Sequence, residues 1–152
     1  MKNKASTEQG KTVSKISCEI RCLDPAAVEA AMRLLDADGM ALVPYTCQIS
    51  GDREEILLLG TRLATRLAAR LAETLPEAGD AAGARILAGL YASELCECDV
   101  ATLTRLPEHE VVDRLRAFSE SGVLAHRMLH GMHYFRLDSD DAHRAIAALL
   151  PH

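Results

Sequence analysis

The sequence predicts one mainly α-helical domain that carries a short β-hairpin, and three observations support this fold class. Hydrophobic residues make up 49% of the 152 residues, which is enough for one core and hardly two. Aromatic residues supply only 3% and Trp is absent, so the composition favours packed helices over a sandwich or barrel. Apolar residues also recur at helical spacing along much of the chain.

The N-terminal part is expected to begin with an arm and a first helix. Residues 1–17 are polar and basic without a hydrophobic period, which predicts a flexible arm, and this arm with its cysteine pair is expected to extend to residue 24. Asp24 and Pro25 are typical of a helix start, and the helix is expected to end at Gly39. Residues 40–50 contain a proline among β-forming residues, which indicates an irregular or briefly extended connection.

Residues 52–75 are expected to form the longest helix. Five apolar side chains recur there at helical spacing, flanked by arginines: Ile56, Leu59, Leu63, Leu67 and Leu71. This stripe is broad enough for a core and for a second subunit, which predicts a homodimer whose interface also uses the final helix around Ile146 and Leu150. The alternative is a simple core helix. Residues 25–78 are accordingly expected to be a helical extension used for dimerisation.

The C-terminal part, residues 79–152, is expected to form a winged helix-turn-helix that binds DNA. The expected elements are helices at 84–91, 98–106 and 107–118, strands at 123–127 and 133–137, and a helix at 139–150. Pro107 stands at the first position of the third helix, and Gly122 ends that helix. The two strands form a hairpin, which is the wing of such a fold.

Whole-chain features bear on the compartment and the partners. No apolar run approaches the ~20 residues that span a bilayer, and the N-terminus lacks the apolar core of a signal peptide. We therefore expect a cytoplasmic protein with no membrane partner. The formal net charge of −5 disfavours nucleic acid but is compatible with a local basic face. Five cysteines in a reducing compartment indicate metal or redox chemistry instead of a disulfide framework.

Four of the cysteines form two closely spaced pairs. Cys96 and Cys98 lie in ELCECD at the start of a helix, where backbone amides and the helix dipole are expected to lower the thiol pKa. Cys18 and Cys22 lie in SCEIRC on the arm. All-thiolate ligation selects soft ions, so we expect a site for Cd(II), Pb(II), Zn(II) or Hg(II) that assembles when the ion arrives.

Two segments resemble the ArsR/SmtB family of metal-sensing winged-helix repressors. ELCECDVATL is similar to the signature that precedes the recognition helix in that family, and SCEIRCLD is similar to the arm of its cadmium- and lead-responsive branch. The resemblance covers residues 17–24 and about 84–147. Ala101 stands where the arsenic-sensing members have a third cysteine, which disfavours arsenite sensing.

The resemblance implies both a ligand set and a function. The implied metal ligands are Cys18, Cys22, Cys96 and Cys98, with the arm of one subunit reaching the helix of the other. The implied function is a transcriptional repressor that binds double-stranded operator DNA as a homodimer and is released by the ion.

Three further residues are weaker candidates for metal ligation. Cys47 lies in a segment, residues 40–77, that is longer than the family carries; it is a fifth ligand, a replacement for one of the four, or an unligated core thiol. Asp141 and His143 match the first half of a zinc motif used by other family members, but the second half is missing. We expect them to be a carboxylate at a helix N-terminus and a surface histidine.

The expected DNA contacts are unusual because the recognition helix begins with glutamates. Glu108 and Glu110 stabilise the first turn through the helix dipole, but carboxylates are repelled by phosphates. Affinity is then expected to come from basic groups that bind the DNA backbone. The candidate contacts are Arg105, Glu108, His109, Arg114, Arg116, Arg127, His130, His133 and Arg136. The alternative is that the arginines are ordinary solvated charges.

Two other functions use the same residues. One is a metal-binding winged-helix dimer that has lost sequence-specific DNA binding, and the other is a thiol redox sensor based on Cys96 and Cys98. An enzyme is not expected, because no nucleophile and base pair, phosphate loop or paired carboxylates stand out.

Overall fold

The computed structural model describes residues 23–46 and 51–150. In chain order its elements are α2 (Pro25–Leu34), β1 (Met40–Thr46), β2 (Arg53–Leu59), α3 (Thr61–Ala72), the 3₁₀ turn η1 (Pro76–Ala78), α4 (Ala81–Gly89), β3 (Leu95–Cys96), α5 (Glu97–Thr104), α6 (Glu108–Glu120), β4 (Leu124–Leu129), β5 (Met132–Leu137) and α7 (Asp140–Ala147). The expectation of a mainly α-helical fold with a β-hairpin is confirmed.

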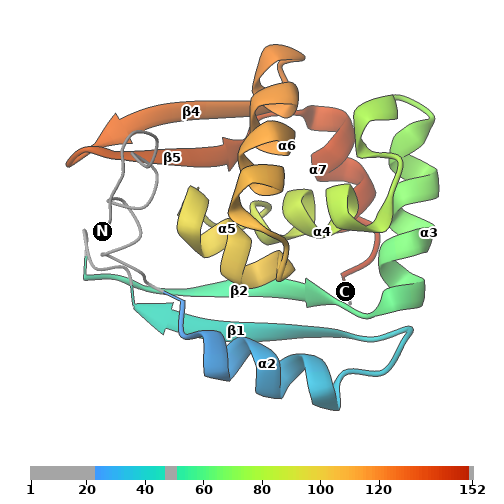
Figure 1. Ribbon diagram of the computed structural model, residues 1–152. Coiled ribbons are helices and arrows are strands. Elements are labelled where there is room, and N and C mark those ends of the chain that lie inside the picture. Colours follow the sequence, from blue (N-terminus) through green and yellow to red (C-terminus); the bar gives the residue numbers. More distant parts are fainter. Residues whose placement is uncertain (1–22, 47–50, 151–152) are drawn as a thin grey trace.

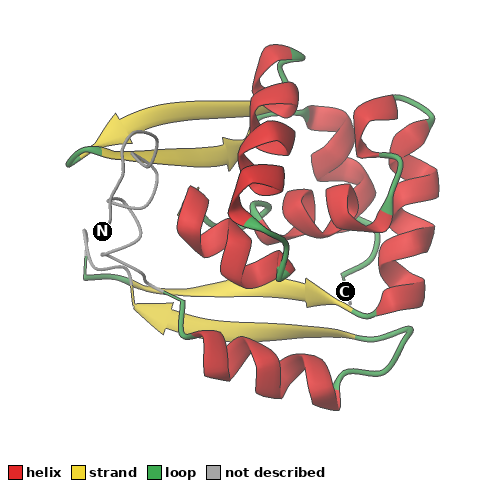
Figure 2. Ribbon diagram, in the orientation of Figure 1, coloured by secondary structure: helices red, strands yellow, loops and turns green. Residues whose placement is uncertain are grey.

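Two hairpins close opposite ends of the molecule. Figure 1 shows the β1–β2 hairpin with α2 along one end and the β4–β5 hairpin at the other, with α4 and α5 between them. Figure 2 shows the same division of strands and helices by colour. None of the helices within the described ranges is long and apolar enough to cross a lipid bilayer.

The first helix, α2, agrees with the prediction. The Asp24 side chain caps it by accepting a hydrogen bond of 3.0 Å from the Ala26 N–H, and Pro25 occupies its first turn. Val28 is buried in the core, where α2 packs on β1 and α5. Leu34, at the last turn, stays 87% exposed.

The hairpin of β1 and β2 overturns part of the sequence prediction. The two strands pair antiparallel with Val43 opposite Ile56, so the single helix expected over residues 52–75 is wrong for residues 53–59. The helix was predicted because Ile56 and Leu59 continue the helical spacing of the apolar residues that follow them. However, residues 56–59 are four consecutive buried side chains, a pattern that also suits a strand covered on both faces.

Gly60 marks the change from β2 to α3. A Cβ at this position would lie 2.1 Å from the Asp36 carbonyl oxygen and 2.6 Å from that of Ala37. Only glycine permits this approach, in which the Gly60 N–H donates to the Gly39 carbonyl over 2.9 Å. The helix therefore starts at Thr61 instead of at residue 52.

The apolar stripe of α3 is buried inside the subunit. Leu67 and Leu71 have no exposed surface, and α3 packs on α4 and α7 of the same chain. Ile146 on α7 is equally buried. These side chains are covered within one chain, as in the alternative of a simple core helix, whereas Leu150 is only partly buried.

The C-terminal half follows the predicted order of elements, with one addition. The short strand β3 pairs with β5, giving an antiparallel sheet in the order β3-β5-β4. The hairpin turn has positive φ at His130 (53°) and Gly131 (76°), as a tight two-residue turn requires. Gly122, with φ of 84°, ends α6 as expected.

Candidate functional site

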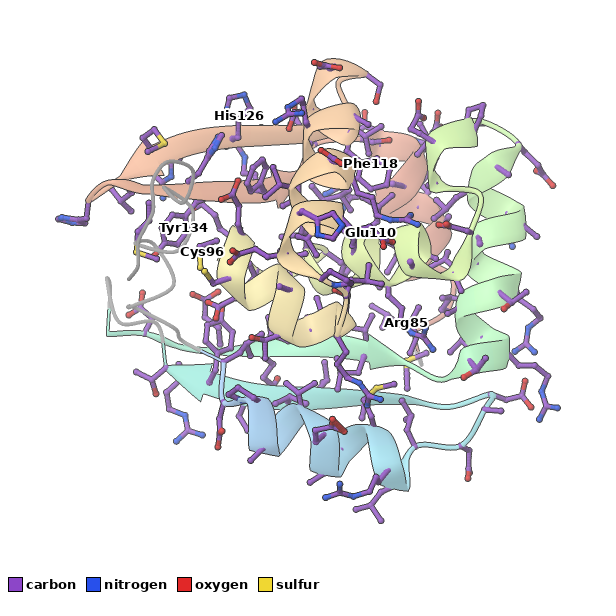
Figure 3. The ribbon with its side chains drawn as sticks, in the orientation of Figure 1. Arg85, Cys96, Glu110, Phe118, His126 and Tyr134 are labelled. Carbon is purple, nitrogen blue, oxygen red and sulfur yellow. The ribbon has the colours of Figure 1, made fainter. Side chains whose placement is uncertain are left out.

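One face of the β3-β5-β4 sheet carries a buried sulfur cluster. Cys96 on β3 lies opposite Tyr134 on β5, and residues opposite each other in an antiparallel pair share a face. Cys96, Tyr134, Cys98 and Met132 form a separate apolar cluster in which every member is less than 5% exposed. Figure 3 shows Cys96 and Tyr134 together beside α5.

The Cys96 thiol does not have the lowered pKa that the sequence predicts. Cys96 is the N-cap residue of α5, but burial and, to a smaller extent, the Asp99 carboxylate raise its thiol pKa to about 12. Desolvation and the negative charge therefore outweigh the backbone amides of the helix N-terminus. Cys96 is a free, protonated thiol at neutral pH, so an ion that binds it must displace a proton.

Cys98 lies between the sheet and the start of α6. Its Sγ atom is 3.4 Å from Oε2 of Glu108, the first residue of α6. Cys98 is disulfide-bonded, so its sulfur becomes a thiolate ligand only after reduction. The neighbouring Glu97 is half-buried, and burial and the charge of Glu108 both raise its carboxyl pKa. The cysteine motif is thus in direct contact with the first turn of α6.

Asp99 binds the end of the arm that was expected to be flexible over residues 1–24, so this expectation is wrong for Leu23. The Leu23 N–H donates a hydrogen bond of 3.1 Å to Asp99 Oδ1, and both residues are only 1% exposed. A second contact joins the same regions, because Arg105 at the end of α5 pairs with Glu29 of α2 over 3.1 Å. The described chain therefore begins directly beside the cysteine motif. The candidate ligands Cys18, Cys22 and Cys47 lie outside the described residues.

Asp141 and His143 have partners unrelated to metal binding. The Asp141 carboxylate pairs with Arg144 on the next turn of α7, and the His143 ring lies 5.3 Å from that of Tyr91. Throughout residues 23–46 and 51–150, no three His, Cys, Asp or Glu side chains are grouped as a metal centre.

Most of the arginines predicted to contact DNA are in ion pairs within the chain. Arg127 donates two hydrogen bonds, of 2.8 and 2.6 Å, to the Glu94 carboxylate. Arg114 is bound by Asp80 over 2.9 and 2.8 Å and by Glu110 over 3.2 Å.

The other expected DNA contacts differ in their surroundings. Arg116 lies 3.6 Å from Asp113, whereas Arg136 is exposed and has no ion pair among the described residues. His109 is exposed on α6 and His130 is exposed at the tip of the β4–β5 hairpin.

The opposite face of the sheet carries a histidine pair that the sequence analysis did not identify as a unit. His126 on β4 and His133 on β5 approach each other to 2.7 Å between Nδ1 and Nε2. They border a cavity of about 430 Å³ whose walls come from α5, α6, β4 and β5. Its lining includes Glu97, Arg116 and Ser119.

Comparison of the chain with protein-family models, with curated proteins and with solved structures gives no match.

Proposed function

We propose that the protein is a metal-responsive transcriptional repressor with a winged helix-turn-helix fold. The order α4, β3, α5, α6, β4, β5 supports this architecture, with α6 as the recognition helix and the β4–β5 hairpin as the wing. In this proposal the protein binds operator DNA as a homodimer. A soft, thiophilic ion such as Cd(II), Pb(II), Zn(II) or Hg(II) binds the cysteines and releases it.

The observation that carries the proposal is the contact between the cysteine motif and α6. Cys98 Sγ lies 3.4 Å from Glu108 Oε2 at the start of that helix. An ion bound at Cys98 brings positive charge and new ligands to this position, so it alters the contact that places the first turn of α6. Metal binding at Cys98 and the position of the recognition helix are then energetically coupled.

The position of Leu23 favours a site built within one subunit. Its N–H is bound to Asp99 of the same chain, and Leu23 directly follows the arm cysteine Cys22. We therefore propose that the arm and the Cys96–Cys98 motif of one chain supply the ligands. This arrangement differs from the intersubunit site that the family resemblance implies.

DNA binding and its control by metal are tested together by fluorescence anisotropy. Reduced protein is titrated against DNA from upstream of its own gene, with and without Cd(II), Pb(II) or Zn(II). We expect the ion to weaken DNA binding, and Cys98→Ser to abolish that response together with the ultraviolet thiolate-to-metal absorption. Cys47→Ser is the matched control and should change neither. The repressor proposal fails if no such DNA binds at low salt with or without a chelator.

The subunit arrangement is tested with a mixed dimer. One subunit carries Cys18→Ser and Cys22→Ser, and the other carries Cys96→Ser and Cys98→Ser. A site within one chain leaves no intact site in this dimer, whereas an intersubunit site leaves one. Sedimentation of the wild-type protein at micromolar concentration establishes first whether it is a dimer, and a monomer would remove the basis for two-fold operator recognition.

The disulfide of Cys98 favours a second candidate, a thiol redox switch at the same motif. In that case two thiols transfer two electrons and two protons to an oxidant such as hydrogen peroxide. DNA binding would then change between the reduced and oxidised protein in the presence of a chelator. The repressor proposal expects no such change without a metal ion.

A further inference from the structure

Three side chains with metal-ligating atoms share the face of the β4–β5 hairpin opposite the sulfur cluster. His126 and Met128 are two residues apart on β4, so they point to the same side of the strand. Met128 lies directly opposite His133 in the register, and His126 lies opposite Phe135. The face therefore presents two imidazoles and a thioether, whereas Arg127 points the other way and is bound to Glu94.

The two imidazoles are already arranged around a single exchangeable proton. His126 Nδ1 and His133 Nε2 are 2.7 Å apart, so one nitrogen donates and the other accepts. Both rings also lie against Phe135, with centroid distances of 6.0 Å for His126 and 4.5 Å for His133. A metal ion that replaces the shared proton finds two nitrogen ligands whose rings are held by the same aromatic neighbour.

Core packing does not account for Met128. Its side chain is 62% exposed, and it is one of three large hydrophobic side chains in the described residues that face solvent. A thioether is a soft ligand that carries no charge and needs no deprotonation. Met128 thus adds a third ligand, a thioether, to the two imidazoles.

The surroundings of the histidine pair favour a cation. The adjoining cavity is lined by two carboxylates, Glu97 and Glu120, and by one cation, Arg116, which also lies 3.6 Å from Asp113. The Ser119 Oγ is buried at this cavity and has no hydrogen-bond partner among the described residues. The cavity therefore has a surplus of negative charge and a free hydroxyl.

We propose that His126, Met128 and His133 form a binding site for a soft monovalent ion, Cu(I), on the face of the hairpin that borders the cavity against α6. Two imidazoles with one thioether suit Cu(I), because thioethers select this ion and imidazole binds copper well. Hard ions prefer oxygen ligands, which none of these three side chains supplies. The site is separate from the sulfur cluster, which lies on the other face of the same sheet and takes its sulfur atoms from Cys96, Cys98 and Met132.

The test uses Ag(I), a redox-inert ion with the ligand preferences of Cu(I), and nuclear magnetic resonance signals that report each side chain separately. The full chain, labelled at the methionine methyl groups and the histidine ring nitrogens, is reduced, freed of reductant under nitrogen and titrated past the filling of its cysteines. We expect the Met128 methyl and the His126 and His133 ring nitrogens to shift at the same Ag(I) concentration. His130, exposed at the tip of the same hairpin, should not shift.

Variants give the outcomes that support or overturn the site. Loss of a direct ligand should cost at least as much as the 10- to 100-fold effect of changes in outer-shell partners, so Met128→Leu should weaken Ag(I) binding to the histidine pair by about 100-fold or more. His133→Gln should abolish the Met128 shift, and His130→Gln should change nothing. The proposal is wrong if the Met128 methyl stays in place while the imidazoles shift, or if Zn(II) moves the imidazoles and Ag(I) does not. Thiolate absorption is recorded separately, so failure here leaves the proposed repressor function untouched.

Discussion

The two faces of the β3-β5-β4 sheet carry different ligating atoms in opposite surroundings. On one face, Cys96 and Tyr134 are closed off from solvent beside α5, to which Leu23 is bound through Asp99. On the other, His126 and Met128 are exposed on β4, with a cavity next to the histidine. Strand alternation places these side chains on different faces, because neighbouring residues of β4 and β5 point to opposite sides of the sheet.

This difference determines how each set responds to protons and ions. The buried thiol of Cys96 stays protonated because burial and the negative charge of Asp99 raise its pKa. For His133, burial and the neighbouring His126 lower the ring pKa, so the neutral, ligating form is already favoured. We call the face with Cys96 and Tyr134 the sulfur face and the face with His126, Met128 and His133 the imidazole face. A metal ion must displace a tightly held proton from Cys96 on the sulfur face. On the imidazole face the proton that it must displace is readily lost.

The largest expected effect is a difference in unfolding free energy between a buried and an exposed position of the imidazole face. Phe135 is 3% exposed and supports both histidine rings, so Phe135→Ala should lower the free energy of unfolding by about 3–5 kcal/mol. Met128→Ala, at an exposed position of the same face, should change it by about 0.5 kcal/mol or less. Urea denaturation of both variants measures the difference, and equal losses would show that the hairpin face is uniformly packed.

On the sulfur side, the residue whose loss should destabilise the fold is Asp99 of α5. Asp99→Ala leaves the buried Leu23 N–H without its acceptor, which should cost about 1–3 kcal/mol of unfolding free energy. Asp99→Asn retains a side-chain oxygen and should cost less. The Cys96 thiol pKa should fall in both variants, because the carboxylate charge raises it in the wild type. Urea denaturation and the pH dependence of thiolate absorption test the two statements, and an unchanged pKa would contradict the assigned cause.

The free energy of unfolding should fall at high pH because of Cys96. The thiol pKa is about 12 in the folded protein against an ordinary 9.0, so the folded state holds the proton more tightly. This contribution is complete below pH 9.0 and is lost as the pH rises toward 12. Urea denaturation at about pH 8 and about pH 10.5 should show a smaller decline for Cys96→Ser than for the wild type. Parallel declines would mean that Cys96 is not the group responsible.

His133 should produce a smaller dependence of the opposite sign at low pH. Its pKa lies below the ordinary 6.5 because of burial and then the charge of His126, so the unfolded chain binds the proton more readily. The contribution is complete above pH 6.5 and is lost as the pH falls from 6.5 through the folded-state pKa. His133→Gln should flatten this part of the stability curve in the presence of a chelator. His130→Gln, at an exposed position, is the control and should not.

The helices of the C-terminal half could be predicted because local signals define them. Pro107, Gly122 and the apolar spacing of α6 set that helix to within a residue or two. β3 was missed because two residues carry no periodicity, and β2 was missed because its buried run of apolar residues also fits helical spacing.

The candidate site was less predictable than the fold. The spacing of Cys96 and Cys98 identified the motif, but the raised pKa of Cys96 depends on burial and on the Asp99 carboxylate. The bond from Leu23 to Asp99 spans 76 positions, so no local pattern indicates it. The strand predicted at 123–127 includes His126 but stops before Met128, so the sequence did not place these two side chains on one strand face.

The smallest expected effect concerns two arginines on the sulfur side of the hairpin. Arg127 and Arg136 both point to that face, but Arg127 is held by two hydrogen bonds to Glu94, whereas Arg136 has no ion pair among the described residues. A phosphate must compete with Glu94 for Arg127 and does not compete for Arg136. If the protein binds DNA through this hairpin, Arg136→Ala should reduce the slope of log affinity against log salt by about 0.9, as expected for one lost phosphate contact. Arg127→Ala should reduce it less, and Glu94→Gln should raise the slope by freeing Arg127. Anisotropy titrations at several salt concentrations measure all three, and a larger effect of Arg127→Ala would show that DNA displaces Glu94.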